Sequence, residues 1–255
     1  MDDGQRPAAT DTRDSDIHRP LNGRRALVTG ASRGIGLAIV HSLITAGASV
    51  AMVSRSTALL GEMAASLGPD AHPFACDLTD AAEVARLVAE VGASWADGPD
   101  ILVNNAGVFE LAQVHETEPA MFRRALDTNL MAPFMVAHAF LPGMRERGRG
   151  HVVTIGSIAD RMVFPENGAY AASKHGARAL HEVLRAESRG TGVRVTLISP
   201  GPVATSIWDP IVPEGRPGFT PRTGMLDASA VADAVLWAIT RRPEVNVDEL
   251  RLSRS

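Results

Sequence analysis

Three side chains in the second half of the chain have the types and spacing needed for proton transfer. Tyr170 is the only tyrosine, Lys174 follows it by four positions, and Ser157 precedes it by 13. Residues i and i+4 share one face of a helix, so Tyr170 and Lys174 can point into the same crevice. A free tyrosine has a pKa of about 10, and a neighbouring ammonium lowers that pKa because it stabilises the phenolate. We therefore expect Tyr170 to exchange a proton with a carbonyl or alcohol oxygen to which Ser157 is hydrogen-bonded.

A glycine-rich turn stands near the start of the chain. Gly30, Gly34 and Gly36 follow an apolar run and enter a helical pattern, with the spacing G-x-x-x-G-x-G rather than G-x-G-x-x-G. Glycines at such a turn let backbone N–H groups approach a pyrophosphate at the positive end of a helix. A purely structural turn is the alternative, but its place in the first strand–helix unit favours a dinucleotide site.

The end of the next apolar run indicates which dinucleotide is bound. An acidic residue there would accept hydrogen bonds from the ribose of NAD, whereas this chain has Arg55. Together with Arg33 in the glycine turn, Arg55 could hold a 2′-phosphate through charge-assisted hydrogen bonds. The sequence therefore predicts NADP(H) rather than NAD(H). The alternative is that both arginines are solvated surface residues.

Further candidate ligands follow the third and fourth apolar runs. Asp77 could accept a hydrogen bond from the adenine amino group, with Leu78 packed nearby, or it could simply begin a helix beside the capping residue Asp80. Ligands of open α/β sheets bind at the carboxyl ends of strands, where the fourth run ends. Asn104, Ala106 and Gly107 lie there, although Asn104 could instead only tie down neighbouring backbone.

Short aliphatic runs alternate with helical patterns, which is typical of a parallel sheet covered by helices. A long segment without periodicity, 201–226, has the composition of a lid or binding loop. The expected strands are 25–29, 49–54, 72–75, 101–104, 151–156, 193–199 and 245–252, and the expected helices are 34–46, 56–68, one starting at Asp80 in a capping-box-like sequence, 117–140, 168–188 and 228–239.

The composition excludes several classes of protein. The chain of 255 residues is 45% hydrophobic, carries a net charge of −4 and has one cysteine. It thus predicts a globular protein of a reducing, cytoplasmic compartment, with no membrane span and no nucleic-acid partner. Residues 1–20 are polar and are expected to form a disordered tail, with 21–255 as a single domain. The eight histidines show no metal-ligand spacing, so no metal is expected.

The ordered set of motifs resembles the short-chain dehydrogenase/reductase family in its short single-domain form, over residues 21–252. The motifs are Thr29-Gly30-x-x-x-Gly34-x-Gly36, Asp77, Asn104-Asn105-Ala106-Gly107, Asn129, Ser157, Tyr170-x-x-x-Lys174 and Pro200-Gly201-x-Val203-x-Thr205. The resemblance implies a Rossmann-type, doubly wound α/β fold, with a parallel seven-stranded sheet and helices on both faces. It also implies a homodimer or homotetramer.

The resemblance assigns further roles. It implies a catalytic tetrad in which Asn129 holds a water that connects Lys174 to solvent, while Lys174 and Tyr170 also contact the cofactor. Ser32, Arg33 and Ile35 would line the phosphates and the adenosine ribose. The nicotinamide carboxamide would be received by Pro200, Gly201, Val203 and Thr205.

We therefore expect an NADP(H)-dependent oxidoreductase that moves a hydride between the nicotinamide and a ketone or secondary alcohol. The expected substrate contacts, among them Phe109, Ile207 and Trp208, are mostly apolar. Arg161 could meet a substrate carboxylate or phosphate, although a solvated arginine is expected. The end of the chain resembles family members that act on 3-hydroxy acids or 3-ketoacyl groups. The alternatives are an NADP(H)-binding sensor without turnover, and an epimerase or dehydratase on the same fold.

Overall fold

The computed structural model describes residues 19–255, so most of the segment expected to be disordered lies outside the described residues. Arg19 and Pro20, assigned to that segment, form a turn, in which the Asn22 N–H donates to the Arg19 carbonyl at 3.0 Å. The turn leads directly into the first strand.

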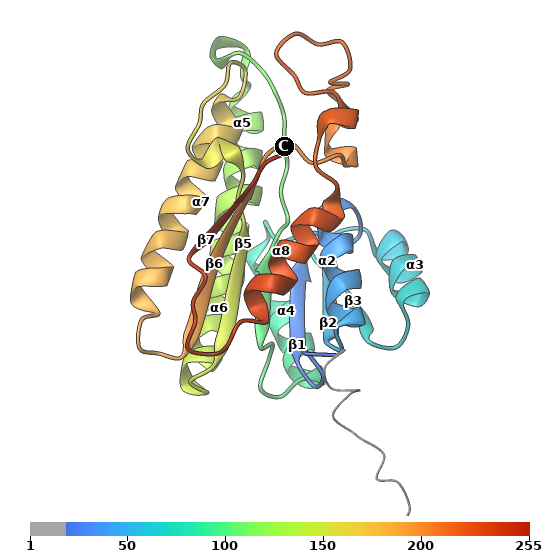
Figure 1. Cartoon of the computed structure of the whole chain (residues 1–255), viewed down its shortest axis with the longest axis vertical. Helices are drawn as coiled ribbons and strands as arrows, with labels where there is room; N and C mark the ends of the chain where they lie inside the picture. The colour runs from blue at the N-terminus through green and yellow to red at the C-terminus, as the bar shows by residue number, and fades with distance from the viewer. Residues whose placement is uncertain (1–18) are drawn as a thin grey trace, which may run out of the picture.

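Seven parallel strands form one sheet in the order β3-β2-β1-β4-β5-β6-β7 (Figure 1). The order reverses between β1 and β4, and this reversal opens a crevice at the carboxyl ends of the strands. The fold expected from the sequence is thereby confirmed. The strands are β1 (Arg25–Thr29), β2 (Ser49–Ser54), β3 (Ala71–Ala75), β4 (Ile101–Asn104), β5 (Gly150–Ile155), β6 (Val193–Pro200) and β7 (Glu249–Leu252).

Helices cover both faces of the sheet because successive strand residues point to opposite sides. Val28 and Val103 pack with α2, α3 and α8 in one apolar cluster, while Leu27 and Leu102 pack with α4 and α6 in another. Residues 201–226 stand above the carboxyl ends of the strands (Figure 1). The helices are α2 (Gly34–Thr45), α3 (Thr57–Leu67), α4 (Ala81–Ser94), α5 (Pro119–Leu126), α6 (Ala132–Glu146), α7 (Gly168–Glu187) and α8 (Ala228–Ile239).

The single long helix expected over 117–140 is wrong. The segment consists of α5, one π-helical turn η2 (Asp127–Met131), and α6. Pro133 has no N–H and so cannot donate to the carbonyl of Asn129, which interrupts the regular i to i−4 ladder at this point. The interruption lies at a residue of the expected tetrad, as is frequent for π-helical turns at functional sites.

The last strand is shorter than expected: it spans Glu249–Leu252 rather than 245–252. Ahead of it, the Asn246 side chain accepts from the Val195 N–H at 2.8 Å and donates to the Val195 carbonyl at 3.1 Å. A side-chain amide therefore takes the place of backbone pairing beside β6. The alternation of apolar residues over 245–252 does not show whether a residue pairs with β6 through its backbone or through its side chain.

Candidate active site

A cleft of about 520 Å³ lies at the carboxyl ends of the strands, within the size range of small-molecule and cofactor sites. The glycine turn forms one wall, and Tyr170 and Lys174 of α7 form another. Most of the predicted site residues line this cleft: Gly30, Ser32, Arg33, Gly34, Ile35, Gly36, Arg55, Asp77, Leu78, Ala106, Gly107, Tyr170, Lys174 and Thr205.

The glycine turn is held tightly against the end of β4. Gly30 has φ +65°, and a Cβ on it would lie 2.9 Å from the Cα of Ala106. A Cβ on Gly36 would lie 2.1 Å from the Gly30 carbonyl oxygen. Only glycine fits at these two positions, because a side chain would collide with backbone.

Asn105, rather than Asn104, ties the turn to β4. Its side-chain amide donates to the carbonyl oxygen of Thr29 at 2.8 Å, and the Thr29 hydroxyl accepts from the backbone N–H groups of Asn105 and Ala106. Asn104 is buried and does not line the cleft; its Oδ1 atom has no hydrogen-bond partner among the described residues.

Both predicted phosphate ligands are exposed in the cleft wall. Arg33 and Arg55 form no ion pair with any residue in the described part of the chain, so their guanidinium groups are available to an anion. Asp77 accepts hydrogen bonds from the N–H and the hydroxyl of Thr79, at 2.9 and 2.7 Å. These bonds, with the charge of Arg55 as a further contribution, lower the pKa of the Asp77 carboxyl.

Glu83 does not complete the capping box expected with Asp80. The Asp80 carboxylate accepts from the Ala82 N–H at 2.8 Å, but Glu83 accepts from the backbone N–H of Asp77 at 2.7 Å. Glu83 thus steadies the cleft-lining segment rather than the N-cap of α4.

The tyrosine and the lysine meet as their spacing predicted. The Lys174 ammonium nitrogen lies 5.7 Å from the Tyr170 ring centroid and donates to the carbonyl oxygen of Ile155 at 3.0 Å. Burial lowers the pKa of Lys174 to about 8. Burial also raises the pKa of Tyr170 to about 12, although a hydrogen bond with the Ser157 side chain acts in the opposite direction. In the chain without cofactor, desolvation outweighs this hydrogen bond, so the pKa of Tyr170 is raised where the sequence predicted a lowered one.

Asn129 is buried and makes three hydrogen bonds from the π-helical turn. Its Oδ1 accepts from the Val108 N–H at 2.8 Å, and its Nδ2 donates to the Val108 carbonyl at 3.0 Å and to the Ser173 hydroxyl at 2.9 Å. A small cavity of about 10 Å³ adjoins it, lined among others by Asn104, Thr154 and Lys174. That volume is about the size of one water.

An aromatic chain leads from Tyr170 towards the lid. The Phe109 ring packs edge-on against Tyr170, with centroids 4.7 Å apart, and Trp208 packs against Phe109 at 5.1 Å. Phe219 continues the chain at 6.4 Å from Trp208. These side chains form an apolar wall beside the tyrosine, in agreement with the apolar contacts expected there.

Arg161 is not the solvated arginine expected from the sequence. Its Nε donates to the Asp160 carboxylate at 2.9 Å, and its terminal nitrogen pairs with Glu249 of β7. An arginine held by two carboxylates is already neutralised, so it is not a receptor for a substrate anion.

Several predicted cofactor ligands do not reach the cleft. Pro200, Gly201 and Val203 lie at and just beyond the end of β6 without lining it. Val108, expected as a substrate contact, lines the cleft, as does Asn105 of the motif that follows the fourth strand. Other residues of the cleft were not predicted as site residues, because neither small polar nor isolated apolar side chains carry a spacing signal: Ser54, Ser56, Leu59, Cys76, Thr79, Thr128, Ile155, Gly156 and Ser206.

No helix of the described residues is both long and apolar enough to cross a membrane. Within residues 19–255 there is also no group of three or more His, Cys, Asp or Glu side chains placed to hold a metal ion.

Comparison with known proteins identifies the family. Residues 24–215 match the family model described as short chain dehydrogenase. The chain is 35% identical over 240 residues to farnesol dehydrogenase of Aedes aegypti, covering 90% of this chain and 95% of that protein. It is 39% identical over 211 residues to D-threitol dehydrogenase of Mycolicibacterium smegmatis, covering 77% and 81%. A solved closed form of serine dehydrogenase complexed with NADP+ superposes with a TM-score of 0.82 at 31% identity, covering 89% and 94%. The chain therefore belongs to the short-chain dehydrogenase/reductase family.

Proposed function

We propose that the protein is an NADP(H)-dependent oxidoreductase that interconverts a ketone and a secondary alcohol. One observation carries the proposal: Tyr170 and Lys174 stand in the same cleft as the glycine turn and the two free arginines. Proton transfer and dinucleotide binding can therefore occur side by side. Dehydrogenases of farnesol and D-threitol among the relatives support an alcohol substrate.

The cleft fits a dinucleotide. Gly30 and Gly36 leave backbone exposed where a Cβ could not be placed, and Gly34 begins α2, whose N-terminus attracts a phosphate. Arg33 and Arg55 would hold the 2′-phosphate of NADP(H). Ser32 and Ile35 would line the pyrophosphate and ribose, Asp77 and Leu78 the adenine, and Thr205 the carboxamide.

A bound nicotinamide would supply or accept the hydride, and in its oxidised form it would add a positive charge to the site. Tyr170 donates its proton to the carbonyl oxygen during reduction and takes it back during oxidation. Its raised pKa keeps the phenol protonated at neutral pH, as a proton donor must be. Ser157 hydrogen-bonds the same oxygen, and the Lys174 ammonium favours the phenolate when it forms.

Asn129 and the small cavity support the proposed proton relay. The cavity lies between Asn129, Asn104 and Lys174, and can hold about one water. Such a water would connect the Lys174 ammonium with the unpartnered Oδ1 of Asn104. Proton exchange at Tyr170 could then continue through Lys174 towards solvent.

Assembly and location complete the proposal. Exposed apolar side chains on and around α5, α6 and α7, namely Phe122, Met131, Phe134 and Val183, support a homodimer or homotetramer, which sedimentation would distinguish. We also propose a cytoplasmic protein, because its one cysteine is buried and unpaired.

The test is NADPH-dependent turnover, followed by nicotinamide absorbance over a panel of ketones, 3-keto esters and secondary alcohols. Tyr170→Phe should lower kcat by about 10³-fold, because the proton donor is lost, while NADPH still binds. Turnover that does not depend on Tyr170 would contradict the mechanism. Cofactor binding without turnover on any carbonyl would instead favour the sensor alternative.

A further inference from the structure

A buried carboxylate lies next to the site residues but was not among those expected from the sequence. Asp160 is only 1% exposed and ends the short helix η3 (Ile158–Asp160) that follows Ser157. Burying a charge is unfavourable unless it is paired and hydrogen-bonded. Each oxygen of Asp160 has such partners, and they belong to different elements.

The first oxygen of Asp160 holds the backbone at Ser157. Oδ2 accepts from the Ser157 N–H at 3.4 Å and from the hydroxyl of Ser199 on β6. It lies over Gly156, where a Cβ would come within 2.7 Å of it. In return, the Ser157 hydroxyl oxygen accepts from the Ala159 N–H at 3.1 Å, which completes a capping box.

This capping box has a consequence for the chemistry of Ser157. A hydroxyl has one proton to donate and two lone pairs to accept with. Because the Ala159 N–H occupies one lone pair, the Ser157 oxygen is fixed in position, and its proton is donated to the Tyr170 hydroxyl, where the hydrogen bond acts to lower the pKa of the phenol. Donation is what the proposed role of Ser157 at the substrate oxygen requires.

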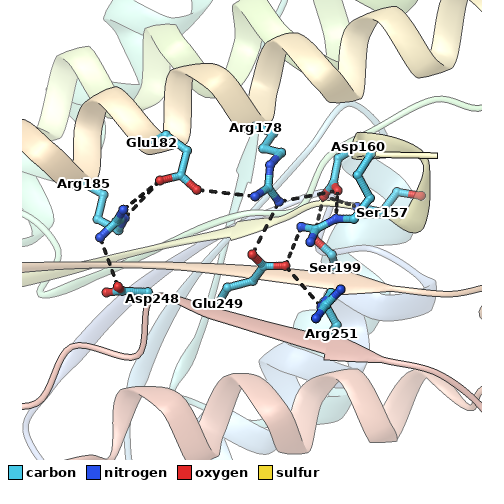
Figure 2. Close-up of polar contacts among 10 residues, drawn as sticks. Ser157, Asp160, Arg178, Glu182, Arg185, Ser199, Asp248, Glu249 and Arg251 are labelled. Atoms are coloured by element: carbon cyan, nitrogen blue, oxygen red, sulfur yellow. Dashed lines mark hydrogen bonds and ion pairs between the residues drawn. The ribbon is translucent and has the colours of Figure 1, made fainter. Parts of the chain in front are cut away.

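The second oxygen of Asp160 joins this turn to α7 and β7. Oδ1 accepts from Arg161 Nε at 2.9 Å and lies 3.8 Å from Arg178 of α7. Arg161 also pairs with Glu249 of β7. Arg178 pairs with the same carboxylate at 3.4 Å (Figure 2). Arg178 lies one turn beyond Lys174 on the same helix, so the ion-pair network ties the serine turn to the helix that carries Tyr170.

We propose that Asp160 is a positioning residue for the reaction: it fixes the Ser157 hydroxyl relative to Tyr170 through the capping box and the Arg161–Arg178–Glu249 network. This inference rests on the proposed function of the same site. Asp160 also acts through its charge. The charged and titratable groups around it are Arg161, Arg178, Lys174 and Tyr170, with Glu249 behind the arginines.

Its negative charge contributes to raising the pKa of Tyr170 and opposes the lowering of the pKa of Lys174 by burial. Both effects favour a protonated phenol and a charged ammonium. Loss of the charge should therefore move the alkaline limb of the reductase pH profile to lower pH, which a purely structural residue would not do.

The test is Asp160→Asn, which keeps the side-chain size and removes the charge. We expect kcat to fall about 10-fold, since small misplacements of reacting groups have effects of this order, with the KM for NADPH unchanged and the alkaline midpoint at lower pH. Asp248→Asn is the matched control, because Asp248 lies outside the Arg161–Arg178–Glu249 network and pairs with Arg185 at 3.0 Å. That variant should behave as wild type.

A folded Asp160→Asn protein with wild-type kcat and pH midpoint would overturn the proposal, even if its melting temperature fell. If this variant does not fold, Arg161→Gln decides. This substitution removes the guanidinium that pairs with Asp160 at 2.9 Å. The Arg161 side chain is 26% exposed, so its replacement disturbs the core less than a change at Asp160 does. We expect it to lower kcat without changing the KM for NADPH, and a wild-type kcat would overturn the proposal.

A second measurement separates this inference from the proposed function. Tyr170 is the only tyrosine, so the ultraviolet absorbance of tyrosinate reports its ionisation without any substrate. Asp160→Asn should lower the Tyr170 pKa, with Tyr170→Phe as the blank and circular dichroism confirming that the fold persists. A lowered pKa in a protein without turnover would refute the function but not the influence of Asp160. An unchanged pKa would overturn the electrostatic part of the inference.

Discussion

At the level of single residues, the site contains two buried titratable side chains, Tyr170 and Lys174, and two exposed arginines, Arg33 and Arg55. Burial keeps the Tyr170 phenol protonated and lowers the pKa of Lys174 to about 8. The cleft supplies the opposite environment a short distance away, where Arg33 and Arg55 are exposed and without carboxylate partners in the described part of the chain. Proton chemistry and anion binding are thus separated within one cleft.

Arg55 should decide the choice of cofactor. Arg55→Asp removes a charge-assisted hydrogen bond, worth roughly 1.5–3 kcal/mol, and repels a 2′-phosphate. We expect kcat/KM with NADPH to fall by about 10-fold or more and the preference to move towards NADH. Parallel steady-state kinetics with both cofactors measure this. Arg242→Asp, at an exposed arginine outside the cleft, is the control. An unchanged ratio of the two cofactors would show that Arg55 does not hold the phosphate.

At the level of secondary-structure elements, Asn129 of the π-helical turn η2 links two neighbouring segments by hydrogen bonds. Asn129 joins the loop after β4, through Val108, to α7, through Ser173. Lys174 follows Ser173 directly, so the hydrogen bond from Asn129 to Ser173 holds α7 in place beside the lysine. The interruption at Pro133 thereby helps to hold two sides of the cleft together.

Asn129→Ala should weaken both the fold and the reaction. It leaves the backbone groups of Val108 without their partners in a half-buried place at the cleft wall, which costs about 1–3 kcal/mol of unfolding free energy. Urea unfolding measures the loss, and kcat should fall with it. Asn22→Ala, at an exposed position, is the control. Wild-type stability in Asn129→Ala would mean that these three bonds do not hold the turn.

At the scale of the whole molecule, two apolar layers on either side of the sheet enclose buried histidines whose ionisation affects folding. Burial lowers the pKa of His151 on β5 to about 3, and that of His181 on α7 to about 4. Both stay neutral in the folded protein down to those values, whereas in the unfolded chain they take up protons below about pH 6.5. Stability from these groups is therefore present above pH 6.5 and is lost as pH falls towards 4 and 3.

His181→Leu should reduce the acid sensitivity. Between pH 7 and pH 5 each histidine accounts for about 2 kcal/mol of lost unfolding free energy, so the variant should lose about 2 kcal/mol less than wild type. Urea unfolding at the two pH values measures the difference. His115→Leu, at a side chain that is 75% exposed, should leave it unchanged. An unaltered pH dependence in His181→Leu would mean that His181 is not neutral in the fold.

Features that depend on neighbours along the chain can be predicted from the order of the residues. Strand alternation, the glycine turn, and the pairing of Tyr170 with Lys174 are local, because periodicity and steric limits act over a few residues. The seven strands and the central cleft residues, among them Gly30, Tyr170 and Lys174, followed from these local patterns, whereas Ser32, Ile35 and Thr205 were predicted from the family resemblance.

Features that depend on partners far away in the sequence became visible in the folded chain alone. Arg161 pairs with Glu249, which is 88 positions away, so no local pattern could show that it is neutralised. Asn105 bonds to Thr29 and Gly30 across a separation of more than 70 residues, which made it, and not Asn104, the support of the turn. The pKa of Tyr170 is raised rather than lowered for the same reason. Desolvation depends on all the groups packed around the phenol, and the spacing of residues along the chain does not show these groups.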